Sequence, residues 1–130
     1  MFKLFCLNIF FINILDMRKN KIVWFIIGCV FLMIMLFCSK IYRPWIYQTG
    51  LFDFYIADTY TNLFGVPTIF FLGISFFKTT KVSIALLGIT AVYIFGEIFS
   101  WLQNGSFDYM DVIATFLGCG LALVLYHIFK

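Results

Sequence analysis

The sequence is poor in charged side chains. Only 12% of its 130 residues are Asp, Glu, Lys or Arg, whereas 64% are hydrophobic. Soluble globular domains carry about 25% charged residues, so this chain has too little polar surface to cover a particle in water. The mean hydropathy of +1.05 agrees with this conclusion. The composition therefore excludes an ordinary soluble domain and predicts that lipid is the main solvent.

Recognisable metal, cofactor and catalytic motifs are also missing. The four cysteines form no C-x-x-C pair and no metal-ligand spacing; they are Cys6, Cys29, Cys38 and Cys119. The sequence contains no Ser-His-Asp set, phosphate-binding loop or H-E-x-x-H pattern. We therefore expect no disulfide framework, no metal and no cofactor, and we do not expect an enzyme.

Long apolar segments are what the sequence does contain. A membrane-spanning helix needs about 20 mostly apolar residues, so 130 residues joined by short loops have room for four. We predict an all-α, polytopic membrane protein, with a four-helix transmembrane bundle over residues 22–130 after a cytoplasmic N-terminal segment, residues 1–21. The predicted spans are about 22–38, 58–77, 82–101 and 112–129.

The basic run that follows Met17 is typical of a true N-terminus, so a start of translation at Met17 is an alternative. The first span is not expected to be a cleaved signal peptide. Bulky residues, Met35 to Phe37, stand before Cys38, where a cleavage site requires small ones.

The connection between the first two spans is aromatic and too polar to cross a membrane. We expect residues 39–58 to form a loop along the membrane surface, where amphipathic rings settle. Asp58 is placed to cap the second span. Within that span Pro67 deprives the carbonyl of Leu63 of its usual donor. Because lipid offers no replacement, that carbonyl needs another partner in the bundle; a kinked helix is the simplest outcome.

Basic residues are distributed unevenly among the loops. Those of the N-terminal segment, the middle loop and the tail are Lys3, Arg18, Lys19, Lys21, Lys78, Lys81 and Lys130. Only Lys40 and Arg43 lie between the first two spans. By the positive-inside rule this pattern places both termini in the cytoplasm, N-in and C-in. It orients a membrane protein and is no sign of nucleic-acid binding.

Glu97 lies inside the third predicted span. An ionisable group within a spanning segment is energetically expensive and marks a candidate functional site. The alternative is that Glu97 reaches water at the interface or bonds a neighbouring helix. His127, at the other end of the bundle, is interpreted as an interfacial residue and not as a ligand.

Asp108 and Asp111 stand at the start of the fourth span. Asp108 at the N-cap and Asp111 in the first turn form a capping arrangement that accounts for both. Glu97, Gln103 and Asp58 are expected at similar depth, however. Several carboxylates on one membrane face can bind a cation, relay a proton or hold a polar headgroup, so these five residues are the functional candidates.

Small residues recur every four positions along the fourth span, at Ala114, Gly118 and Ala122. Such spacing lets helix backbones approach closely in lipid. Asp111 and Thr115 lie on the same face. The helix-packing face is therefore expected to turn Asp111 towards the other helices.

The segment from Glu97 onwards resembles the VanZ-like membrane proteins of bacteria. The matching residues are the intramembrane Glu97, Gln103, Asp108, Asp111-Val112 and Gly118, and the likeness covers roughly residues 55–126. The family's usual Arg before the Asp pair is missing here. The resemblance implies an envelope protein of the bacterial inner (cytoplasmic) membrane.

Three functions stay open at this point. The first is a non-enzymatic, VanZ-like protein whose acidic outer face engages an envelope component or partner membrane protein. The second is a small secondary transporter or cation- or proton-coupled protein that titrates Glu97 and forms a homo-oligomer. The third is a membrane enzyme acting on a lipid-linked substrate, with Glu97 and Asp111 as acid and base.

Overall fold

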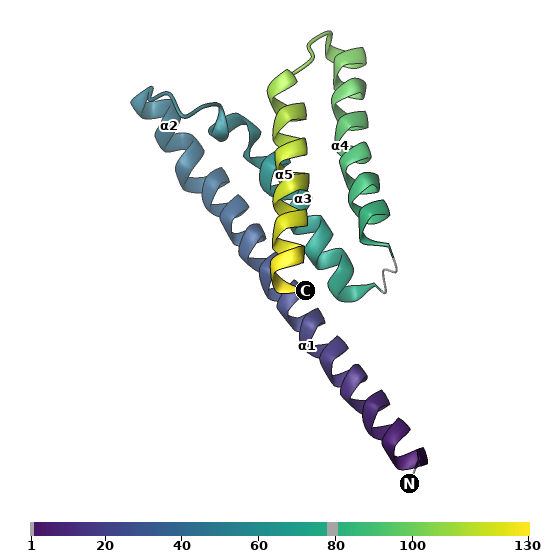
Figure 1. The fold of residues 1–130 in the computed structure, drawn as a ribbon. Helices are drawn as coiled ribbons and strands as arrows, with labels where there is room; N and C mark the ends of the chain where they lie inside the picture. The colour runs from purple at the N-terminus through teal and green to yellow at the C-terminus, as the bar shows by residue number, and fades with distance from the viewer. Residues whose placement is uncertain (1, 78–80) are drawn as a thin grey trace.

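The computed structural model describes residues 2–77 and 81–130, with side chains described from residue 19 onwards. The described chain is all-helical, in the order α1 (Phe2–Phe37), η1 (Cys38–Tyr42), α2 (Arg43–Thr49), α3 (Ile56–Phe76), α4 (Val82–Asn104) and α5 (Tyr109–Phe129). Figure 1 shows α3, α4 and α5 running alternately up and down, with α1 crossing them obliquely. Lys78 and the side chains of Lys3 and Arg18 lie outside the described residues.

Four helical segments are long and apolar enough to cross a membrane. They are Lys19–Thr49, Ile56–Phe76, Val82–Asn104 and Tyr109–Phe129. This confirms the prediction of an all-α chain with four such helices. Many of their large apolar side chains face outwards; for example, Val92 is 71% exposed and Leu87 is 65% exposed. Contiguous apolar surface on this scale is unfavourable in water and is what a lipid-facing surface requires.

The prediction of a loop over residues 39–58 is wrong for the first half of that range, because the chain stays helical to Thr49. A π-helical turn, η1, precedes α2, and the Arg43 N–H donates to the Cys38 carbonyl five residues earlier. Pro44 falls in the first turn of α2, where a missing N–H is tolerated. The helix ends at Gly50, whose φ of 64° suits a left-handed cap.

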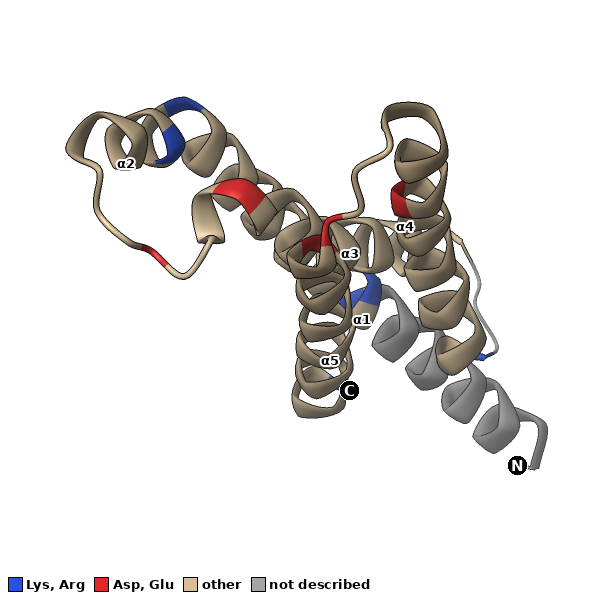
Figure 2. Cartoon of the chain, turned by 90° about the horizontal axis from the view of Figure 1, so that it is seen from above, with Lys and Arg blue, Asp and Glu red and all other residues tan. Residues whose placement is uncertain are grey.

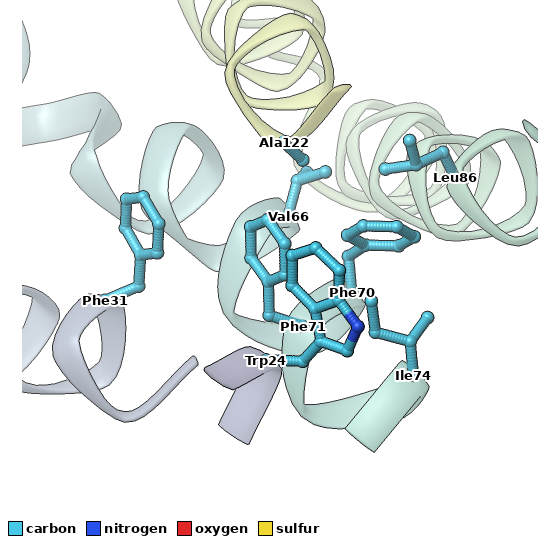
Figure 3. Packing of buried hydrophobic residues seen from close by; sticks show 8 residues of the cluster. All are labelled: Trp24, Phe31, Val66, Phe70, Phe71, Ile74, Leu86 and Ala122. Atoms are coloured by element: carbon cyan, nitrogen blue, oxygen red, sulfur yellow. The ribbon is translucent and has the colours of Figure 1, made fainter. Parts of the chain in front are cut away.

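The core is centred on α3, which packs against α1 on one side and α5 on the other. Trp24 of α1 stacks on Phe71 of α3 and on Tyr126 of α5, with ring centroids 5.6 and 5.1 Å apart. Figure 3 shows the buried cluster, which comprises Trp24, Phe31, Val66, Phe70, Phe71, Ile74, Leu86 and Ala122. Aromatic rings from three helices thus hold the bundle together.

The α3–α5 contact is close enough to involve the backbones. A Cβ atom at Gly118 of α5 would lie 2.5 Å from the carbonyl oxygen of Leu63 and 3.1 Å from that of Asn62. The Leu63 carbonyl is the one that Pro67, inside α3, leaves without its usual donor. Because Gly118 has no side chain, the backbone of α5 can lie against this carbonyl.

Helix α4 is packed more sparsely than the others. Its buried residues are Leu86 and Thr90, and its Gly88 and Gly96 have no neighbouring atom where a Cβ would lie. Most of its surface therefore faces the surroundings. The bundle consists of a tight group, α1, α3 and α5, with α4 at its side.

Replacing Gly118 by Ala is expected to destabilise the bundle by about 1–3 kcal/mol, because the added methyl group meets an immovable backbone carbonyl. The matched control is Gly120→Ala, two residues further along α5, where a Cβ meets nothing within 4 Å. Unfolding in detergent micelles measures both variants. Equal stability of the two would contradict the close α3–α5 contact.

Candidate functional site

Five acidic residues lie towards one end of the bundle. Asp53 belongs to the loop before α3, Asp58 to the first turn of α3, and Asp108 and Asp111 to the start of α5. Glu97 lies about two turns before the end of α4. Figure 2 shows these acidic positions in red on three helices and the loop before α3. The contacts of each carboxylate show whether it is already engaged within the bundle or is free to bind another group.

Two of the five carboxylates are engaged by tyrosines from the preceding helical segment. The Tyr42 hydroxyl donates to Asp53 Oδ2 over 3.2 Å, and the Tyr47 hydroxyl donates to Asp58 Oδ1. Arg43 Nε donates in turn to the Tyr47 hydroxyl over 3.2 Å. These bonds tie η1 and α2 to the start of α3, so Asp53 and Asp58 have a sufficient structural role.

The capping of α3 differs from the expectation. The prediction that Asp58 caps this helix is wrong, because Asp58 already lies in the first turn. The N-cap residue is Tyr55, which makes no side-chain cap bond, and a first-turn amide is instead satisfied by Asp53, whose Oδ2 accepts from the Ala57 N–H over 2.7 Å. The intervening Phe54 and Tyr55 have φ values of 56° and 63°. These left-handed residues turn the chain so that Asp53 reaches back over the helix end.

Asp108 is the N-cap of α5, as predicted. Its Oδ1 accepts from the Met110 N–H over 2.9 Å, and the side chain is exposed. Gln103, in the last turn of α4, is also exposed. Neither residue shows a contact that sets it apart from an ordinary helix terminus.

Asp111 lies on the packing side of α5. The four buried residues of this helix are Ala114, Thr115, Gly118 and Ala122, which share its face. The Asp111 carbonyl accepts from Asn62 Nδ2 of α3 over 3.1 Å and from Thr115 Oγ1 over 2.8 Å. The bond from Asn62 joins the first turn of α5 to α3, whereas the bond from Thr115 lies within α5.

The Asp111 carboxylate has no partner of opposite charge among residues 19–77 and 81–130. Its Oδ1 is buried and receives no hydrogen bond from an N–H or hydroxyl donor, while the carboxyl group lies within hydrogen-bond reach of that of Glu97. The charged groups that act on it are all acidic: Glu97 first, then Asp108 and Asp58. Glu97, half-buried on α4, is the acidic residue that interacts with it most strongly. We refer to Glu97 and Asp111 as the carboxylate pair.

Several residues at this end of the bundle were not singled out from the sequence. Asn62 is 7% exposed and carries the only amide in α3, a signal that an apolar helix was making a polar contact. Thr90 of α4 is 5% exposed, and its Oγ1 has no hydrogen-bond partner in the described structure. Tyr42 and Tyr47 were counted only as interfacial aromatics. Their role depends on helix rotation, which composition does not reveal.

No group of three or more His, Cys, Asp or Glu side chains gathers as a metal site within the described residues. Cys29, Cys38 and Cys119 are free thiols. The arrangement therefore offers one chemically unusual feature, which is the carboxylate pair.

The fold and the site together define a multi-pass helical membrane protein with two adjacent carboxyl groups at one end, which have no basic partner among the described residues. No known family model matches this chain, and comparison with curated proteins and with solved structures finds no match either. Its function has to be argued from its own residues.

Asp111→Asn is expected to stabilise the purified protein by about 1 kcal/mol, because an amide removes the buried like-charge contact and can donate to Glu97. The control is Asp108→Asn, since Asn caps a helix as well as Asp does. Thermal unfolding in detergent compares them. A loss of stability in Asp111→Asn, with the control unchanged, would mean that the carboxylate has a partner that strengthens the fold.

Proposed function

We propose that this chain is a non-enzymatic, VanZ-like integral membrane protein of the bacterial cell envelope. Its carboxylate pair binds a cationic group presented at the outer face of the inner membrane, by an envelope component or a partner membrane protein. The observation that carries the proposal is the pairing of Glu97 with Asp111, whose buried Oδ1 receives no N–H or hydroxyl donor.

Charge compensation is the physical reason for this assignment. Two close carboxylates in a low-dielectric setting need a proton or a cation between them. The basic side chains at this end, Lys40 and Arg43, belong to η1 and α2, and Arg43 is engaged by Tyr47. A cation supplied from outside the chain fills the role that an internal Arg or Lys would otherwise have.

The residues that carry the VanZ resemblance include some that build the fold and some that are left to bind a cation. Asp108 caps α5 and Gly118 allows α5 to touch α3. Glu97 and Asp111, from different helices, are the two that remain for binding. A motif that both builds the α3–α5 contact and supplies the pair supports a shared plan with that family.

Orientation follows from the basic residues. Among those described, Lys19 and Lys21 lie at the start of the first apolar segment and Lys81 and Lys130 at helix ends, all away from the acidic end. Lys40 and Arg43 lie near the acidic end. The positive-inside rule then puts the acidic end outside and both termini in the cytoplasm.

A second candidate is a cation- or proton-coupled transporter. The observation that favours it is Thr90, whose buried hydroxyl lies on the Glu97 side of α4, about 10 Å along the helix axis. An unpartnered polar atom at that depth is the kind of group that lines an ion path. A transporter of this size would assemble as an oligomer.

In cells that lack this protein, wild-type and Asp108→Asn chains are expected to restore growth under envelope-directed antibiotics. Glu97→Gln and Asp111→Asn are expected to lose about tenfold in this activity, the effect of removing about 1.4 kcal/mol of binding. Membrane levels of each variant are measured alongside. Full complementation by both neutral variants would show that the pair is structural.

Proteoliposomes loaded with a pH-sensitive dye distinguish the transporter candidate from the binding function proposed above. A proton flux that is lost in Glu97→Gln would favour transport. The absence of any flux from protein that complements growth would favour binding.

A green-fluorescent fusion after Lys130 is expected to fluoresce, and an alkaline phosphatase fusion at the same place to be inactive, because the predicted C-terminus is cytoplasmic. Phosphatase fused in the α4–α5 connection, at Gly105, is expected to be active. The reverse pattern would place the carboxylate pair in the cytoplasm and overturn the outer-face assignment.

A further inference from the structure

A polar pocket lies at the end of the bundle opposite the carboxylate pair. It has a volume of about 400 Å³ and lies between the first turn of α4 and the last turns of α5; Figure 1 shows these turns at the same end. Its polar lining comprises Lys81, Ser83, His127 and Lys130, and the rest includes Tyr126. Pockets that hold small ligands have volumes of about 300–1,000 Å³.

The charge of this pocket is positive. Two lysines line it, and no acidic side chain is among its lining residues. By contrast, two other hollows, along α1 and between α3 and α4, are lined by apolar side chains apart from Cys29. Lipid tails suit those hollows, whereas this pocket suits an anion.

The backbone of α4 adds donors to the same place. Lys81 occupies the N-cap without a side-chain hydrogen bond, and the first turn of α4 contains no acidic residue. The free N–H groups of that turn and the exposed Ser83 hydroxyl therefore remain available for an acceptor. A helix N-terminus together with flanking lysines is a favourable environment for a phosphate group.

The pocket also has a rigid apolar side. Tyr126 stacks on Trp24 with 5.1 Å between ring centroids, and Lys130 Nζ lies 5.9 Å from the centre of the Tyr126 ring. The aromatic cluster thus fixes the wall, and Lys130 is held over it by a cation–π contact. A ligand bound here meets charge at the helix ends and apolar surface deeper along them.

We propose that this pocket binds the phosphate group of an anionic phospholipid, with its acyl chains along the apolar surface of α4 and α5. The headgroup would accept hydrogen bonds from Lys81, Lys130 and the first turn of α4. Basic pockets between transmembrane helices at a membrane surface are suited to such headgroups. This site is independent of the carboxylate pair and of the function proposed for it.

The test uses purified protein in phosphatidylcholine nanodiscs that contain a minor fraction of phosphatidylglycerol. Native mass spectrometry counts the phosphatidylglycerol that stays bound, and thermal unfolding in detergent measures its stabilising effect. Each lysine removed is expected to weaken binding about fivefold, so Lys81→Gln with Lys130→Gln weakens it about 25-fold. The matched control removes two charges elsewhere, with Lys19→Gln and Lys40→Gln.

Binding that is lost in the pocket variant and kept in the control supports the site. Equal losses in the two double variants, or wild-type retention by the pocket variant, would overturn it. A third arm replaces the lipid by inorganic phosphate in detergent. If phosphate alone stabilises the protein as well as phosphatidylglycerol does, and displaces it, the lipid assignment is overturned in favour of a free phosphate ligand.

Discussion

The bundle depends on the contact between α3 and α5 at Leu63 and Gly118. In lipid, apolar side chains gain little by leaving one apolar surface for another, so helices associate through close packing and hydrogen bonds. Gly118 provides the first by having no side chain against the Leu63 carbonyl. Asn62 provides the second by donating to the Asp111 carbonyl. Pro67 removes one internal hydrogen bond of α3, and the neighbouring helix α5 accommodates it through this contact.

The same contact also positions an acidic residue. It holds the first turn of α5 against α3, and Asp111 of that turn interacts with Glu97 of α4. The remaining acids of that end have local tasks, because Asp53 accepts from a first-turn amide of α3, Asp108 caps α5 and Asp58 accepts from Tyr47. What the sequence presents as a group of five similar carboxylates is divided by the fold into three structural residues and one pair.

The helical class was predictable because it follows from apolar runs of sufficient length, and Asp108 was predictable because capping is a local property. The extension of the first helix through Pro44 was not, since it depends on a π-helical turn that leaves no compositional sign. Asp53 was missed in its role at the start of α3 because Phe54 and Tyr55 adopt left-handed conformations that aromatic residues rarely take. The Asn62–Asp111 contact joins residues 49 positions apart and depends on how two helices are rotated. Periodicity indicates a face, but it does not say which partner that face meets.

The sparse packing of α4 has a mechanical consequence. One member of the carboxylate pair is on α4, which buries few of its side chains, and the other is on α5, inside the tightly packed group. A small tilt of α4 changes the separation of the two carboxylates while the aromatic stack of α1, α3 and α5 stays intact. Repulsion between two ionised carboxylates would act along the same direction, and the proposed cation would remove it. If the pair binds a cation as proposed, the position of α4 would change with occupancy, and a neighbour in the bilayer that touches its exposed face would sense that change.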